Sequence, residues 1–246
     1  MLKKSAVLLF LAATCYSIFL PAYAEDTAEL EAKSNEIITL YAAARKVISD
    51  NQALINDASK GDKGLTADVV VEKTKENYKA KAGKELDLSA ESNPVNVAMI
   101  EAVKEVMNEA QASINQPNVA FKGFIPAAFA HKVATKFTAR MEGKIELKLT
   151  APKEYLRNRA NRPDAWETSV MNDKFRMADY PKEKPVFEMT DSKGKPAFRY
   201  ILPTYYAESC LSCHGLPKGE IDISGGKKEG AVLGELGGAV SLTLFK

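Results

Sequence analysis

Cysteine, histidine and tryptophan are scarce in this chain, which has three Cys, two His and one Trp among its 246 residues. So few thiols and imidazoles leave little room for metal or thiol chemistry and exclude a disulfide-rich scaffold. An excess of charge of one sign is also missing, because 34 Lys+Arg face 32 Asp+Glu. This balance argues against a disordered tail and against a broad nucleic-acid-binding surface. The length allows one large or two small domains with a buried core.

Long hydrophobic runs are absent except at the N-terminus. Lys3 and Lys4 precede an apolar run over 6–20, and the small residues of 22–24 follow it. This order predicts a secretory signal over residues 1–24 that is cleaved before Glu25. The alternative is an uncleaved membrane anchor, but the run is shorter than the ~20 residues that a spanning helix needs.

Cleavage would leave a mature chain, 25–246, with as many basic as acidic residues, 32 of each. It would also remove Cys15, so that Cys210 and Cys213 are the remaining thiols. No second apolar stretch is long enough to cross a bilayer. We therefore expect a periplasmic protein, in an oxidising compartment, that does not span the membrane.

Hydrophobic periodicity divides the mature chain into a helical half, 25–140, and a strand-rich half, 141–246. Apolar residues at helical spacing predict four helices, over 27–58, over 66–81, from Pro94 onward and from about Pro126 onward. Alternating residues predict strands over 145–149, 186–189, 196–202 and 238–244, with a short helix opened by Pro163-Asp164. Helices first and antiparallel strands later indicate one α+β domain.

Cys210-Leu-Ser-Cys213-His214 is the motif that carries chemistry. This Cys-x-x-Cys-His spacing is the attachment signature of haem c. Two thiols on one helical turn can add across the two vinyl groups of one porphyrin, and the next imidazole can then bind the iron as the proximal ligand. The export signal agrees with this prediction because haem c is attached outside the cytoplasm. We predict one covalent haem c.

The motif has three other interpretations. A thioredoxin-like pair would need a βα context, which the pattern lacks. A structural zinc site normally needs four Cys or His ligands, and His131 lies far upstream. A disulfide between Cys210 and Cys213 would close a very short loop and add little stability.

The group at the sixth coordination position of the haem iron would decide between a sensing and an electron-transfer role. His131 is the one other imidazole and could be a distal ligand. The alternative places it on the polar side of its helix, away from Phe129, Val133 and Phe137. The methionines of the mature chain could also ligate through sulfur, although Met99 and Met107 lie at the spacing of core residues. A vacant sixth site would admit a small gas.

Residues 157–167 form a second candidate constellation, with three arginines in the first six positions. Arg157 could meet the haem propionates, whose charge needs compensation. Trp166 could pack on the porphyrin edge. The alternative is a solvated basic loop followed by an ordinary helical turn.

The chain resembles the Tll-type c-haem domain family, exported single-haem proteins with a PAS-like sensor fold. The stretches that carry the resemblance are 44–48, 51–56, 123–130, 156–158, 161–167, the Cys-x-x-Cys-His motif and 234–239. The resemblance implies helices packed on an antiparallel PAS-like sheet, haem held by Cys210 and Cys213, and His214 on the iron. One departure concerns the distal cysteine that a family member is thought to supply from an N-terminal helix. No cysteine lies between Glu25 and Ser209 here.

These observations favour a haem-based redox or gas-sensing module that passes its signal to a separate protein partner. The alternative is a dedicated electron-transfer cytochrome with a six-coordinate haem and a redox protein as partner. A peroxidase-like enzyme would need a distal acid–base pair, and no such pattern is recognisable, so we expect no enzyme. The near-neutral charge gives no sign of nucleic-acid binding.

Overall fold

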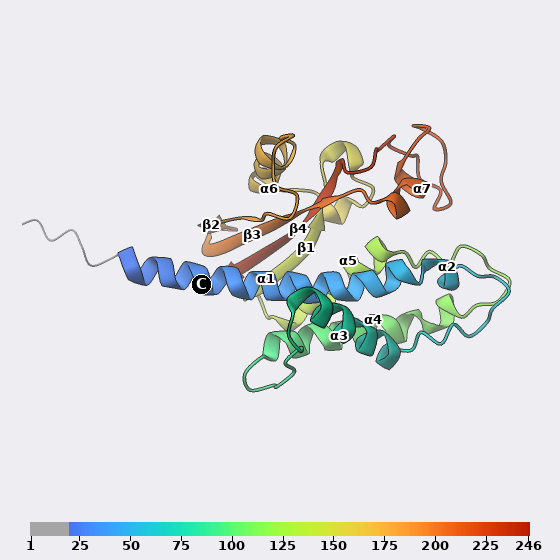
Figure 1. Cartoon of the computed structure of the whole chain (residues 1–246), viewed down its shortest axis with the longest axis horizontal. Helices are drawn as coiled ribbons and strands as arrows, with labels where there is room; N and C mark the ends of the chain where they lie inside the picture. The colour runs from blue at the N-terminus through green and yellow to red at the C-terminus, as the bar shows by residue number, and fades with distance from the viewer. Residues whose placement is uncertain (1–19) are drawn as a thin grey trace, which may run out of the picture.

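The computed structural model describes residues 20–246, and their side chains from residue 26 onward. The predicted signal peptide, 1–24, lies outside the described residues except for 20–24, which begin the first helix. Five helices come first in the described chain: α1 (Leu20–Asp50), α2 (Gln52–Ile55), α3 (Ala67–Ala82), α4 (Pro94–Ile114) and α5 (Pro126–Arg140). They lie together on one side of the sheet, with α1 and α5 next to the strands and α3 and α4 farther away (Figure 1).

Local sequence signals set most helix ends. The Thr66 side chain accepts a hydrogen bond from the Val69 amide at 3.3 Å and so caps α3, as predicted. Gly83 ends α3 with a φ of +71°, in the left-handed region that favours glycine. The helix predicted over 27–58 is instead broken at Asn51. Asn51 leaves the helical conformation with a ψ of 12°. Its side-chain amide, Nδ2, donates a hydrogen bond to the Val47 carbonyl at 2.7 Å.

The sheet has four antiparallel strands in the order β1-β4-β3-β2. Their bounds are Ile145–Thr150 for β1, Val186–Ser192 for β2, Lys195–Tyr205 for β3 and Leu236–Phe245 for β4. Lys193 and Gly194 both have positive φ and form the tight turn between β2 and β3. The predicted hairpin is therefore confirmed, and β3 runs beyond its predicted end.

The inner face of the sheet packs on the helical layer. Phe198 and Tyr200 of β3 and Leu242 of β4 are buried in one core with helical residues. Tyr41 of α1 belongs to the same core, and its hydroxyl donates to the Ala130 carbonyl of α5 at 2.9 Å. The alternate strand residues face the other way, as the two-residue period of a strand requires. The predicted α+β fold, with N-terminal helices on an antiparallel sheet, is confirmed.

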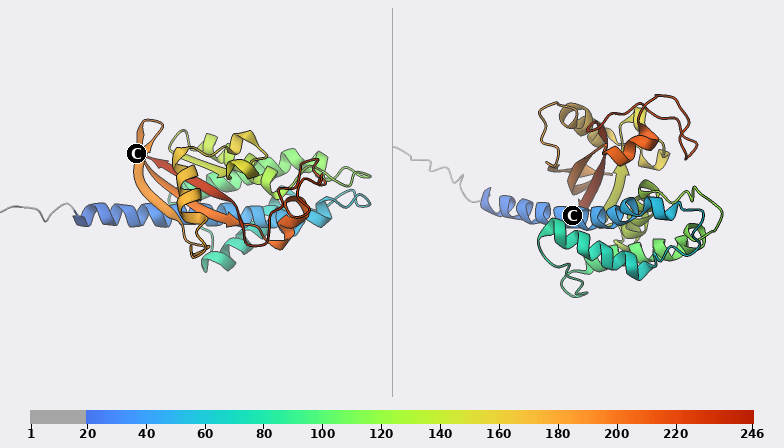
Figure 2. Two further views of the ribbon diagram at one scale, coloured as in Figure 1. Left: turned by 90° about the horizontal axis from the view of Figure 1, so that it is seen from above. Right: turned by 45° about the vertical axis from the view of Figure 1, so that its right-hand side comes forward.

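The outer face is covered by the segment between β1 and β2, which contains α6 (Ala165–Val170) and a π-helical turn (Met171–Phe175). Asp164 caps α6 in a complete capping box with Glu167, which confirms the predicted helix start. The segment between β3 and β4 carries a 3₁₀ turn (Glu208–Cys210) and α7 (Leu211–His214), and it projects past one end of the sheet (Figure 2).

The α-helices of the described chain range in length from 4 to 31 residues. From residue 20 onward, none combines the length and apolar character needed to cross a bilayer.

Candidate functional site

The Cys-x-x-Cys-His segment begins shortly after β3 ends. Cys210 closes the 3₁₀ turn, and Cys213 and His214 lie on the single turn of α7. The turn starts with a hydrogen bond from the Cys210 amide to the Ala207 carbonyl at 2.9 Å. Both cysteines are free thiols and half-buried. The 3₁₀ turn and α7 therefore place the two thiols three positions apart, with the imidazole directly after the second, as the motif predicts.

A cavity of about 390 Å³ lies beside this segment. Cys210, Cys213 and His214 line it together with residues of the sheet and of the helical layer. The helical layer contributes Arg45 from α1, Ile125 just before α5, and Ala127 and Ala128 in its first turn. The volume falls within the range of about 300–1,000 Å³ that is usual for cofactor pockets.

A carboxylate holds the imidazole of His214. Its Nδ1 lies 2.8 Å from Oε2 of Glu229, whose side chain is only 10% exposed. Arg157 in turn forms an ion pair with Glu229 and another with Asp222, and its Nη2 donates to the Cys213 carbonyl at 2.8 Å. Because Nδ1 is engaged by Glu229, Nε2 is the nitrogen that His214 can offer to an iron atom.

This network keeps its carboxylates ionised. Burial alone would raise the pKa of Asp222, but hydrogen bonds from Ser224 and Arg157 outweigh burial and lower the pKa to about 2. Burial would likewise raise the pKa of Glu229, and hydrogen bonds from Arg157 and His214 lower it below the usual value. The ion pairs of Arg157 with Asp222 and Glu229 therefore persist at neutral pH. They connect the segment around His214 to the loop that follows β1.

An aromatic side chain completes the surroundings of the imidazole. The ring of Tyr206, which is 8% exposed, lies with its centroid 5.1 Å from that of His214. Burial is the main cause that raises the pKa of Tyr206, so its hydroxyl stays protonated. Tyr206 thus supports the imidazole as a neutral packing partner.

Small residues keep one wall of the cavity flat. Gly237 and Gly238 at the start of β4 both line it. A methyl group at Gly238 would come within 2.5 Å of the Thr150 carbonyl oxygen, and one at Gly237 would come within 3.0 Å of the Tyr206 ring. Thr150 also lines the cavity, and its buried hydroxyl has no hydrogen-bond partner among the described residues.

The structure places the predicted site residues in two groups. Arg157 lines the cavity with Cys210, Cys213 and His214, but its guanidinium is engaged by carboxylates and backbone carbonyls.

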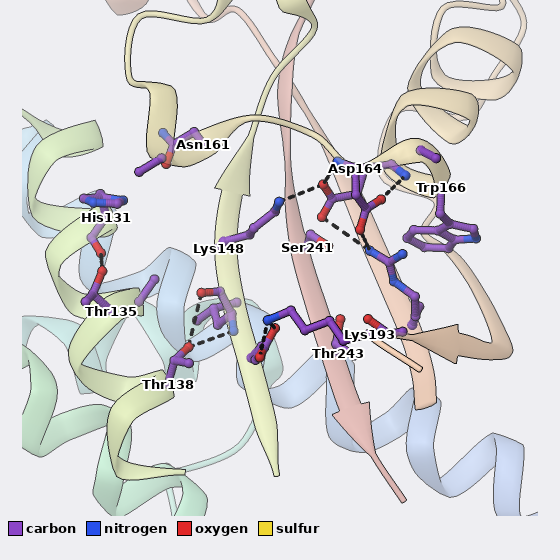
Figure 3. A pocket seen from close by; sticks show the side chains of 18 of the residues that line it. His131, Thr135, Thr138, Lys148, Asn161, Asp164, Trp166, Lys193, Ser241 and Thr243 are labelled. Atoms are coloured by element: carbon purple, nitrogen blue, oxygen red, sulfur yellow. Dashed lines mark hydrogen bonds and ion pairs between the residues drawn. The ribbon is translucent and has the colours of Figure 1, made fainter. Parts of the chain in front are cut away.

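His131 and Trp166 do not line this cavity. Both lie in a second cavity on the outer face of the sheet (Figure 3). Trp166 there donates to Glu188 and stacks under the guanidinium of Arg199, with 4.3 Å between Cζ and the ring centroid. His131 lies on the side of α5 away from the buried Phe129 and Phe137, as its alternative interpretation expects.

Several residues of the site carry no sequence signal. Glu229 follows His214 by 15 positions, and nothing in its neighbours marks it as a histidine partner. Arg45 lies in the helical half, more than 150 positions before the motif. The paired glycines at 237–238 are the exception, because glycines at the start of a strand often mark a place where a ligand or another backbone comes close. The sequence could therefore have indicated that they belong to a site.

The other interpretations of the motif can be compared with this geometry. The thiols follow an antiparallel strand and not a βαβ unit. Within residues 20–246, no group of three or more His, Cys, Asp or Glu side chains is gathered in a way that could hold a metal ion by itself. The site thus offers two thiols and a single oriented imidazole beside a cavity.

Fold and site together define an α+β protein with one Cys-x-x-Cys-His segment between its last two strands. The sequence profile of the Tll0287-like family matches residues 24–244. The chain therefore belongs to the Tll0287-like family. No curated protein and no solved structure shows a significant match to it.

Proposed function

We propose that this protein is an exported monohaem c-type protein that acts as a haem-based redox or gas sensor and not as an enzyme. The observation that carries the proposal is the joint position of Cys210, Cys213 and His214 on one cavity of cofactor size. Export to the periplasm, where haem c is attached, agrees with the predicted signal peptide. A separate signalling or redox protein would be its partner.

The residues of the cavity fit a haem group. Gly237 and Gly238 add no side chain to the wall of the cavity, which leaves room for a flat ring to approach the sheet. Leu149, Ala151 and Leu156 add apolar surface to the lining. The unpartnered hydroxyl of Thr150 offers a hydrogen bond toward the cavity.

Each residue of the site would have its own role. Cys210 and Cys213 bind the porphyrin covalently, and His214 presents Nε2 to the iron. Glu229 fixes the tautomer and orientation of His214, and Arg157 fixes Glu229 and the Cys213 carbonyl. When bound, haem supplies an iron that cycles between ferric and ferrous states and takes small ligands.

The lining of the cavity favours a sensing role. Among the described residues that line it, His214 is the only imidazole, and none is a methionine. His131 lines a different cavity. The described lining therefore offers no second imidazole or thioether to an iron held by His214, and a bound haem would leave room for a small gas. Arg45 also lines the cavity and could donate a hydrogen bond to such a ligand.

One observation favours a dedicated electron-transfer protein as the second candidate. Five large apolar side chains are exposed in the connection that follows the motif: Leu216, Ile221, Ile223, Val232 and Leu233. Exposed apolar residues close to a redox centre are suited to brief docking of a redox partner.

Covalent attachment can be tested directly by producing the chain with a haem c maturation system. We expect a haem-stained band on a denaturing gel for the unaltered protein and for the control Ser212→Ala, which keeps both thiols. Cys210→Ala combined with Cys213→Ala should lose the band. An unaltered protein without covalent haem would refute the proposal.

Carbon monoxide distinguishes the two candidate roles. We expect a high-spin ferrous spectrum that shifts when the gas is added, with the same result in His131→Ala. A low-spin ferrous spectrum that carbon monoxide leaves unchanged would overturn the sensor role and support the electron carrier.

A further inference from the structure

The cavity beside the Cys-x-x-Cys-His motif carries a positive charge that no neighbour balances. Among the described residues that line it, two are arginines and none is Asp or Glu. Arg157 is neutralised by Asp222 and Glu229, which lie outside the lining. Arg45 is half-buried, and no carboxylate in the part of the chain that the structure describes pairs with it. A half-buried cation without a partner favours an anion beside it.

The start of α5 lies next to Arg45. One turn before Arg45, the Tyr41 hydroxyl donates to the Ala130 carbonyl of α5 at 2.9 Å. Just past α1, Nε2 of Gln52 donates to the Phe124 carbonyl, which precedes α5, at 3.3 Å. The two segments therefore run past each other in opposite directions. Arg45 and the first turn of α5 both lie between these two contacts.

The first turn of α5 adds donors of the same kind. Ala127 and Ala128 line the cavity, and their amides lie where a helix leaves its N–H groups without partners. No side chain caps this helix, which is 15 residues long. The positive end of its dipole also lies here. A carboxylate is the kind of group that such a helix start stabilises.

Thr150 gives an independent sign of a ligand. Thr150 is 3% exposed and lines the cavity, and its hydroxyl oxygen has no hydrogen-bond partner among the described residues. A buried hydroxyl without a partner costs free energy, so a ligand atom that bonds to it is favoured. The Leu147 amide donates to the Thr138 hydroxyl of α5 at 3.0 Å, so β1 runs back along α5 and ends toward its start.

We propose that Arg45, the first-turn amides of α5 and the Thr150 hydroxyl bind a propionate carboxylate of the haem. The inference rests on the proposed covalent haem. Haem c has its propionates on the two pyrrole rings that carry no thioether link, so they project away from Cys210 and Cys213. Arg45 and α5 belong to the helical layer, whereas the cysteines belong to the connection after β3 (Figure 1).

Arg45 thus takes the role that the sequence predicted for Arg157, whose guanidinium is already engaged by Asp222 and Glu229. The carboxylate neutralises the charge of Arg45 and satisfies the hydroxyl of Thr150. A guanidinium has five N–H donors, so pairing with a carboxylate leaves donors for a ligand on the iron.

The test uses the full chain with its haem attached and records the propionate bending bands by resonance Raman spectroscopy. Arg45→Gln should shift a propionate band, because the carboxylate loses charge-assisted hydrogen bonds. It should also lower the reduction potential, because a lost cation favours ferric iron. We expect about 60 mV, a tenfold change in a one-electron equilibrium. Lys46→Gln is the matched control, since Lys46 pairs with Asp50 and lies outside the lining. It should change neither quantity.

Two more variants separate carboxylate binding from a structural role. Arg45→Lys keeps the charge and loses the planar fork, so it should keep the reduction potential of the unaltered protein and still shift the band. Thr150→Val keeps the shape of the side chain and removes its hydroxyl. It should also shift the band, and it serves in place of Arg45→Gln if that variant does not fold.

Propionate bands that stay unchanged in Arg45→Gln and in Thr150→Val would overturn the proposal. Weaker azide binding to the ferric iron of Arg45→Gln, with unchanged propionate bands, would also overturn it and assign Arg45 to an anion on the iron. Haem staining on a denaturing gel keeps the two proposals apart, because thioether links do not need Arg45. Unchanged bands in stained Arg45→Gln contradict only the carboxylate site, whereas an unstained unaltered protein contradicts the haem and the site together.

Discussion

At the scale of single residues, the imidazole of His214 is held by a carboxylate and not by a backbone carbonyl. Glu229 accepts from Nδ1 at 2.8 Å and is itself fixed by Arg157. A carboxylate partner gives the imidazole more anionic character, and this makes it a stronger electron donor to a bound metal. The charge of Glu229 should therefore set the reduction potential of the proposed haem.

Glu229→Gln should raise that potential, because the neutral amide removes the negative charge next to the ligand. We expect a rise of about 60 mV, which corresponds to a tenfold change in a one-electron equilibrium. Redox titration of the haem-loaded protein measures it. Glu220→Gln is the matched control, since the Glu220 side chain lies in the same connection and pairs with Lys228 instead of His214. An equal shift in both variants would contradict a specific role for Glu229.

The depressed pKa of Asp222 makes a contribution to stability that depends on pH. Its folded pKa is about 2, and the ordinary value is 3.8. Because the folded value is the lower one, the contribution is complete above about pH 5, where the unfolded group is also ionised, and is lost as the pH falls toward 2. It amounts to about 2 kcal/mol.

Urea unfolding at pH 5 and pH 3 checks this. The loss of unfolding free energy between these values should be smaller in Asp222→Asn than in the unaltered protein. Identical pH dependence of the two proteins would show that Asp222 does not titrate as described.

At the scale of secondary structure, the pairing of β1 with β4 depends on the absence of a side chain at Gly238. The strands approach so closely that a methyl group would lie 2.5 Å from the Thr150 carbonyl oxygen. The same residue lines the proposed haem cavity. Strand pairing and the shape of the site therefore depend on one glycine.

Gly238→Ala should destabilise the fold by about 1–3 kcal/mol, because the strands must separate to admit the methyl group. Denaturant unfolding measures the loss. Gly61→Ala is the control, since the nearest atom to a methyl group there lies 3.9 Å away. The explanation fails if both variants unfold at the same denaturant concentration.

At the scale of the whole molecule, the connection 215–235 is long and contains an isolated β-bridge as its only strand pairing. The Arg157 cluster ties it to the rest of the protein. Two thioether bonds beside it would add a second attachment. Haem loading should therefore suppress local opening of this connection.

Limited trypsin digestion tests that expectation, because Lys218, Lys227 and Lys228 lie in the connection. We expect cleavage there to be at least tenfold faster in the haem-free double variant Cys210→Ala/Cys213→Ala than in the haem-loaded protein. Haem-loaded Ser212→Ala is the control. Equal cleavage rates would show that haem does not restrain this part of the chain.

Local signals predicted much of the fold. Thr66 and Gly83 bound a helix as predicted, and strands alternate as their sequences indicate. The helix predicted over 27–58 was wrong in its continuity, because a side-chain hydrogen bond at Asn51 competes with the helical backbone. Such a competing bond depends on which conformer the surrounding packing favours, and periodicity does not reveal it.

By itself, the sequence determined the α+β class, the Cys-x-x-Cys-His motif and the resemblance to the Tll family, because these depend on local patterns of residues. Only the tertiary structure decided which distant residues meet. It brought Glu229 to His214, directed Arg157 to carboxylates, and placed His131 and Trp166 in a separate polar cavity. Contacts of this kind arise from the pairing of strands and the packing of layers, which bring together residues whose separation along the chain carries no signal.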